Sequence, residues 1–131
     1  MTMMIQHKHL SIGIGCSSRA CTDDVIRLIE ASVDHIPSGT VIATLDRRAS
    51  IGESVASALG LRLVLFPASI LASIGGITTR SSLALSKTCT ANVAEASALA
   101  SLGPDARLIV PQMKGRFCTC AVAALSLGVH P

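Results

Sequence analysis

Apolar runs alternate with amphipathic stretches along most of the chain. Short apolar runs bounded by Gly, Pro or polar residues predict strands near residues 9–15, 40–44, 62–66, 107–110 and 118–125. Between them, apolar residues recur at helical spacing, as in Val25, Ile29 and Val33. This spacing predicts helices at 22–34, 50–59, 67–74 and 92–102. An alternation of strands and helices in this order predicts an α/β fold.

Residues at the ends of the predicted helices support these boundaries. Thr22 is a suitable N-cap, and the acidic residues that follow it suit the positive first turn of a helix. Ser50 and Glu53 have the spacing of a capping box. Gly60 then fits the left-handed position that ends many helices.

The last two predicted strands are too close in sequence for a crossover connection. They are therefore expected to form an antiparallel hairpin, with a basic turn over residues 111–117. We expect a three-layer α/β/α fold with a mostly parallel, mixed sheet of about five strands that ends in this hairpin. A length of 131 residues suits a single domain over residues 1–131. Within it, 1–8 is expected to be a frayed N-terminus and 75–91 a flexible segment.

Composition narrows the classes of function. The net charge of +3 favours small anionic ligands over a long phosphate backbone, and aromatic residues make up only 2% of the chain. Few stacking surfaces are thus available for bases, so we expect no nucleic-acid partner. Apolar runs are too short to span a bilayer, so we expect no membrane association and a cytoplasmic location. Because the chain has five cysteines, an odd number, we expect reduced thiols. We also expect no metal site and no cofactor.

Ligands of open parallel sheets bind beyond the carboxyl ends of the strands. Four parts of the chain are expected there: the Gly-x-Gly loop after the first strand, the loop after the second, the start of the 92–102 helix and the basic hairpin turn. The candidate ligand-binding residues are Gly13, Gly15, Cys16, Thr44, Arg47, Arg48, Asn92, Lys114 and Arg116. Glu95 is the candidate for acid–base catalysis, or for fixing a loop.

Structural roles could also explain these residues. Gly13 and Gly15 would equally allow tight packing of a strand against a helix, and the arginines would equally suit a solvated loop. The Gly-x-Gly run lacks the third glycine of a dinucleotide fingerprint, and Asp23 and Asp24 would repel a phosphate at the first helix. A small nucleotide-binding domain therefore stays only as an alternative.

Six segments taken together resemble the CobE / CbiG C-terminal domain family of cobalamin biosynthesis. The ordered set with matching spacings covers about residues 11–124, and comprises Gly13–Cys16, Ala43–Arg48, Ala58–Leu61, Asn92–Ala96, Val110–Lys114 and Thr119–Ala123. The chain has the length of the stand-alone form. It departs from the family at Arg48 and Gln112, where the family commonly has Lys.

The resemblance implies a function in vitamin B12 synthesis. CbiG opens a lactone ring of a cobalt-precorrin and releases acetaldehyde, so the resemblance implies a protein that binds a carboxylate-rich precorrin-type tetrapyrrole. Such a protein could assist lactone opening or hand the intermediate on, and whether it is a hydrolase or an accessory protein stays open. The alternative is a non-catalytic partner of other cobalamin-pathway enzymes. Arginines suit this ligand because they bind carboxylates in bidentate fashion.

Overall fold

A mixed sheet of five strands forms the centre of the protein. The computed structural model describes residues 8–74 and 92–126, and the sheet order is β3-β2-β1-β5-β4. The strands are β1 (Lys8–Cys16), β2 (Val41–Leu45), β3 (Arg62–Phe66), β4 (Arg107–Lys114) and β5 (Cys118–Ser126). β1, β2 and β3 are parallel, whereas β5 is antiparallel to both of its neighbours. The carboxyl ends of β1 to β4 therefore meet at one edge of the sheet.

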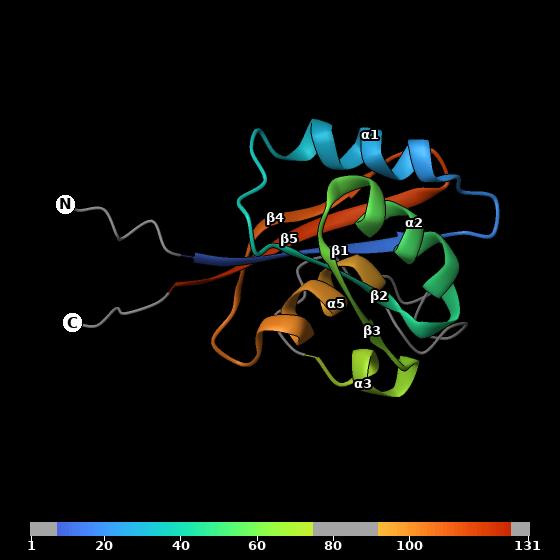
Figure 1. Ribbon diagram of the computed structural model, residues 1–131. Coiled ribbons are helices and arrows are strands. Elements are labelled where there is room, and N and C mark those ends of the chain that lie inside the picture. The colour runs from blue at the N-terminus through green and yellow to red at the C-terminus, as the bar shows by residue number, and fades with distance from the viewer. Residues whose placement is uncertain (1–7, 75–91, 127–131) are drawn as a thin grey trace.

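Helices cover both faces of this sheet, and α1 and α5 lie on opposite sides of it (Figure 1). The helical elements are α1 (Thr22–Ser32), η2 (Asp46–Arg48), α2 (Ala49–Leu59), α3 (Ala68–Ala72) and α5 (Val93–Leu102). On one face α1 and α2 bury a core of aliphatic side chains, among them Ile14, Ile29 and Val55. On the other face, small residues of α5 pack against the sheet, and α3 packs beside α5. The predicted three-layer α/β/α fold is confirmed.

The predicted helix starts are partly wrong. Cys21 is the N-cap of α1 in place of Thr22, and its thiol donates to Asp24 Oδ2 at 3.2 Å. α2 begins at Ala49 and not after Ser50, because η2 leads directly into it through a hydrogen bond from Ala49 N to Asp46 O. The predicted end of α2 is confirmed, since Gly60 has φ 72° in the left-handed region.

The hairpin of β4 and β5 is confirmed, but β4 is longer than predicted. Pro111 was expected to end this strand, yet the strand continues to Lys114. A proline is tolerated there because β4 is the edge strand, and the register shifts on both sides of Val110. The predicted flexible segment 75–91 lies outside the described residues, as do residues 1–7. Within the described ranges, no helix is long and apolar enough to cross a membrane.

Candidate functional site

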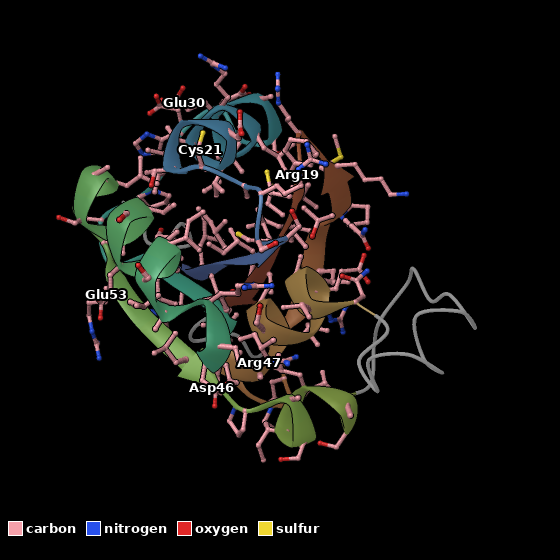
Figure 2. All side chains as sticks on the ribbon, turned by 90° about the vertical axis from the view of Figure 1, so that its right-hand side faces the viewer. Arg19, Cys21, Glu30, Asp46, Arg47 and Glu53 are labelled. Atoms are coloured by element: carbon pink, nitrogen blue, oxygen red, sulfur yellow. The ribbon has the colours of Figure 1, made fainter. Side chains whose placement is uncertain are left out.

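A pocket of about 530 Å³ opens at the edge where β1, β2 and β4 end. We call it the main pocket. Figure 2 looks onto this edge, with Arg19 and Cys21 on the α1 side and Asp46 and Arg47 on the side where β2 ends. The walls of the main pocket come from the ends of three strands, the start of α5 and the hairpin turn. The lining residues are Gly15, Cys16, Ser17, Leu45, Arg47, Arg48, Asn92, Val93, Gln112, Lys114, Gly115, Phe117, Cys118 and Thr119.

The main pocket is positively charged. Arg47, Arg48 and Lys114 line it, and none of the described lining residues is an Asp or Glu. Arg48 is half-buried and donates from Nε to Cys16 O at 2.9 Å, which ties η2 to the end of β1. A guanidinium held through Nε still presents its Nη donors in a fixed direction. The pocket therefore offers oriented donors that suit an anion.

Phe117 forms an apolar wall of the main pocket that the sequence reasoning missed. In the described part of the chain it is the only non-glycine residue with positive φ, at 63°. Its carbonyl accepts from Ser17 N at 2.9 Å, so the hairpin turn is joined to the loop after β1. Arg19 Cζ and Arg116 Cζ lie 4.6 and 5.5 Å from the ring centroid. Arg116 thus stacks on Phe117 and does not itself line the pocket.

The two glycines of the Gly-x-Gly run have different surroundings. Gly15 lines the main pocket, but a Cβ added to it would meet Thr119 Oγ1 at 2.7 Å. Gly13 lies away from the pocket and faces α5, where an added Cβ would come within 1.9 Å of Ala94 O. Gly13 therefore serves the close packing of β1 against α5, which was the alternative interpretation from sequence. Its predicted contact with a ligand has no support in this geometry.

Three further candidate residues have structural hydrogen bonds. Thr44 is fully buried outside the pocket lining and donates from Oγ1 to Ile14 O at 2.7 Å. Asn92 lines the pocket and also caps α5, because its Oδ1 accepts from Glu95 N at 2.9 Å. Glu95 is fully buried, and its Oε2 accepts from Gln112 N at 2.8 Å. This bond joins α5 to the irregular part of β4, as the loop-fixing interpretation of Glu95 requires.

Cysteine side chains form part of the pocket wall as neutral thiols. Burial, followed by the neighbouring Cys118, raises the pKa of Cys16 to about 12, although Arg48 opposes this rise. Burial likewise raises the pKa of Cys118 to about 11, with smaller contributions from Asp24 and nearby thiols. A protonated thiol is a poor nucleophile and a poor metal ligand. In residues 8–74 and 92–126, no three His, Cys, Asp or Glu residues are grouped so that they could hold a metal ion.

The structure brings together six of the ten candidate residues at the main pocket: Gly15, Cys16, Arg47, Arg48, Asn92 and Lys114. Gly13, Thr44, Glu95 and Arg116 do not line it. Sequence reasoning also missed Leu45 and Val93, which add apolar surface, and their only signal was their position at the ends of predicted elements. The binding roles of all these residues stay predictions.

Comparison with known proteins agrees with the fold and the resemblance. The family described as "Cobalamin synthesis G C-terminus" matches residues 10–123. CobE, a protein from the cobalamin biosynthetic pathway, is 26% identical with a TM-score of 0.76, covering 90% of this chain and 91% of CobE. Cobalamin biosynthesis protein ChiG from Agrobacterium tumefaciens is 27% identical with a TM-score of 0.64, covering 87% of this chain and 96% of ChiG.

A third structure shows the same fold inside a longer chain. A cobalamin biosynthesis protein G homologue from Sulfolobus solfataricus is 22% identical with a TM-score of 0.70, and the match covers 88% of this chain and 36% of that one. No relative was found among curated protein sequences. Because the family match spans nearly the whole chain, this protein belongs to the CobE / CbiG C-terminal domain family of cobalamin biosynthesis.

Proposed function

We propose that this protein binds a carboxylate-rich, precorrin-type tetrapyrrole intermediate in its main pocket and hands it on within cobalamin synthesis. The observation that carries the proposal is the set of three cations, Arg47, Arg48 and Lys114, around a pocket with apolar walls. A precorrin combines a large ring face with several carboxylates at its rim. Such a ligand needs both an apolar surface and separated cations.

The positions of these groups suit the two parts of the ligand. Leu45, Val93 and Phe117 supply apolar surface for the ring, and the cations come from two separate walls. η2 contributes the two arginines, whereas β4 contributes Lys114. Carboxylates at different points of the ring rim can therefore each meet a cation.

Binding is supported better than acid–base catalysis. The described lining residues include no Asp, Glu or His, and Cys16 and Cys118 are held as neutral thiols. Glu95, the candidate acid or base, is buried behind the wall and bonded to the backbone of β4. Participation in lactone opening would consist of presenting the substrate to a catalytic group of another protein.

A titration with hydrogenobyrinic acid, followed by the visible spectrum, tests the proposal. A charge-assisted hydrogen bond contributes about 1.5–3 kcal/mol, so Lys114→Gln should raise Kd by about 10- to 100-fold. Arg107→Gln is the matched control, because Arg107 is an exposed cation at the opposite end of the same strand. The proposal fails if the unmodified protein gives no spectral change, or if both variants weaken binding equally.

One observation favours a second role, as a partner of other cobalamin-pathway enzymes. Ile109 and Met113 are 50% and 41% exposed on the edge strand β4. Exposed apolar side chains on an edge strand are a common feature of protein contacts. Size-exclusion chromatography with individual pathway enzymes would detect a complex, and Ile109→Lys should abolish it. No co-elution with any of these enzymes would exclude this role.

A further inference from the structure

A second, smaller cavity adjoins the main pocket. We call it the side pocket. It has a volume of about 340 Å³ and lies between the loop after β1, the start of α1 and the first turns of α2. Ser17, Arg47 and Arg48 line both cavities, so they form the partition between them. The remaining residues of the side pocket are Ser18, Ala20, Cys21, Thr22, Ser50, Ile51 and Ser54.

The chemistry of the side pocket differs from that of the main pocket. Its wall is dominated by hydroxyl groups and two guanidinium groups, and no described lining residue carries a carboxylate. Hydroxyls and guanidiniums both donate hydrogen bonds to a carboxylate, and a guanidinium can do so through two bonds. This combination suits a small anionic group and offers little surface to a ring.

Asp24, an acidic residue close in sequence to the lining, is bonded elsewhere. Asp24 lies in the first turn of α1, where its Oδ2 accepts a hydrogen bond from the Cys21 thiol at 3.2 Å, and it is not part of the cavity wall. Arg48 is anchored on the side of β1 through its Nε bond to Cys16 O. Its Nη donors are thereby held at the partition, where they can reach an anion.

We infer that the side pocket is a carboxylate subsite, which holds one carboxylate arm of the ligand whose ring occupies the main pocket. The assignment to a ligand arm rests on the proposed function, whereas the affinity for a carboxylate does not. Arg47 and Arg48 would then lie between the ring and the arm, and would fix the orientation of the ring about its own axis. A ring with several similar carboxylates would bind in one orientation.

Three variants of α2 test the subsite. Ser50→Glu places a negative charge in the side pocket, at an exposed position in the first turn where acidic residues do not destabilise a helix. We expect it to raise the Kd for hydrogenobyrinic acid about tenfold. Ser50→Gln has a similar size without the charge, so it should raise Kd clearly less than Ser50→Glu does. Ser57→Glu adds the same charge about 10 Å further along the helix and outside both pockets, so it should have little effect.

A second measurement separates the subsite from the proposed function. Citrate is added to the ¹⁵N-labelled protein, and the amide shifts of residues 17–22 and 50–54 are followed by NMR. Saturable shifts that are lost in Ser50→Glu and kept in Ser57→Glu would support the subsite. This result would stand even if hydrogenobyrinic acid did not bind and the proposed function were wrong. Uniform, unsaturated shifts would overturn the subsite. Equal Kd values of Ser50→Glu and Ser57→Glu for hydrogenobyrinic acid would overturn the placement of a ligand arm there.

Discussion

Replacement of Gly13 by alanine tests whether the Gly-x-Gly run serves packing or ligand binding. An added Cβ would lie 1.9 Å from Ala94 O and 2.7 Å from both Ala98 N and Ser97 Oγ. Ordinary contacts of a Cβ begin at 3.4 Å, so α5 would have to withdraw by about 1.5 Å. The closest atoms belong to the backbone of α5, and no side-chain rotation can relieve the overlap.

The expected cost follows from the contacts that α5 would lose. Overpacking in a core costs about 1–3 kcal/mol, and withdrawal of α5 would also break the contact of Ser97 Oγ with Ala43 O, now 3.1 Å, at a cost of about 1 kcal/mol. We therefore expect a loss of about 2–4 kcal/mol in the free energy of unfolding. For 131 residues this corresponds to a decrease in Tm of about 7–15 °C.

Thermal and urea unfolding measure this loss, with Gly60→Ala as the control. Gly60 has φ 72° and open space around it, so alanine there adds only backbone strain of about 1–2 kcal/mol. A stability of Gly13→Ala within 1 kcal/mol of the unmodified protein would refute the packing argument. If the variant were that stable but bound hydrogenobyrinic acid more weakly, Gly13 would have to be assigned to the binding site.

Three further predictions concern polar groups in the core and in the pocket wall. Thr44→Val should cost about 1–2 kcal/mol in urea unfolding, because the variant keeps the shape but loses the hydrogen bond to β1, and an unchanged stability would contradict this role. The raised pKa of Cys16 keeps its thiol neutral at pH 8. Peptide mapping after iodoacetamide treatment at that pH should therefore show exposed Cys21 alkylated at least tenfold faster, with labelling of Cys16 rising with pH and reaching half of its maximal rate only near pH 12. Glu95→Ala should destabilise the protein by about 2–3 kcal/mol, since Gln112 N would lose its acceptor, and amide hydrogen exchange at Gln112 should become faster than in Glu95→Gln.

The pH dependence of stability has a definite sign. The folded-state pKa of Cys16 is raised from 9.0 to about 12, so the folded protein holds this proton more tightly than the unfolded chain. Its contribution to stability is therefore complete below about pH 9 and is lost as the pH rises from 9 towards 12. Cys16→Ala should reduce the decrease in Tm over this range, and an equal decrease in both proteins would contradict the shift.

Local signals in the sequence were sufficient to predict most of the fold. β3 was predicted with its exact bounds because Gly60 and Pro67 enclose it. The predicted 92–102 helix has the end of α5, where Gly103 follows, but begins one residue early because Asn92 is the N-cap. The helix start predicted at Ser50 was wrong, since the preceding residues already form a turn that continues into α2. Pro111 misled it because the position of β4 at the edge of the sheet cannot be read from the local sequence.

The site was harder to predict because its residues depend on tertiary contacts. Arg48 and Lys114 could be chosen from their places after predicted strands. The close approach of α5 to Gly13 depends on the crossing of two distant elements, and no local pattern records it. Phe117 was missed because its role arises from a positive φ in the hairpin turn and from two arginines that meet at its ring.

The pairing of β1 with β5 also determines where further protein could be joined to this fold. Lys8 pairs with Ser126, so β1 begins and β5 ends side by side (Figure 1). The main pocket lies at the opposite ends of the two strands, because it is lined by the last residues of β1 and the first residues of β5. A domain fused before β1 or after β5 would thus start far from the pocket mouth and leave it accessible. The Sulfolobus homologue, of which this fold occupies 36%, shows that the fold occurs within a longer polypeptide. The same arrangement makes these two ends suitable places to attach an affinity tag or a fluorescent reporter without obstructing the ligand.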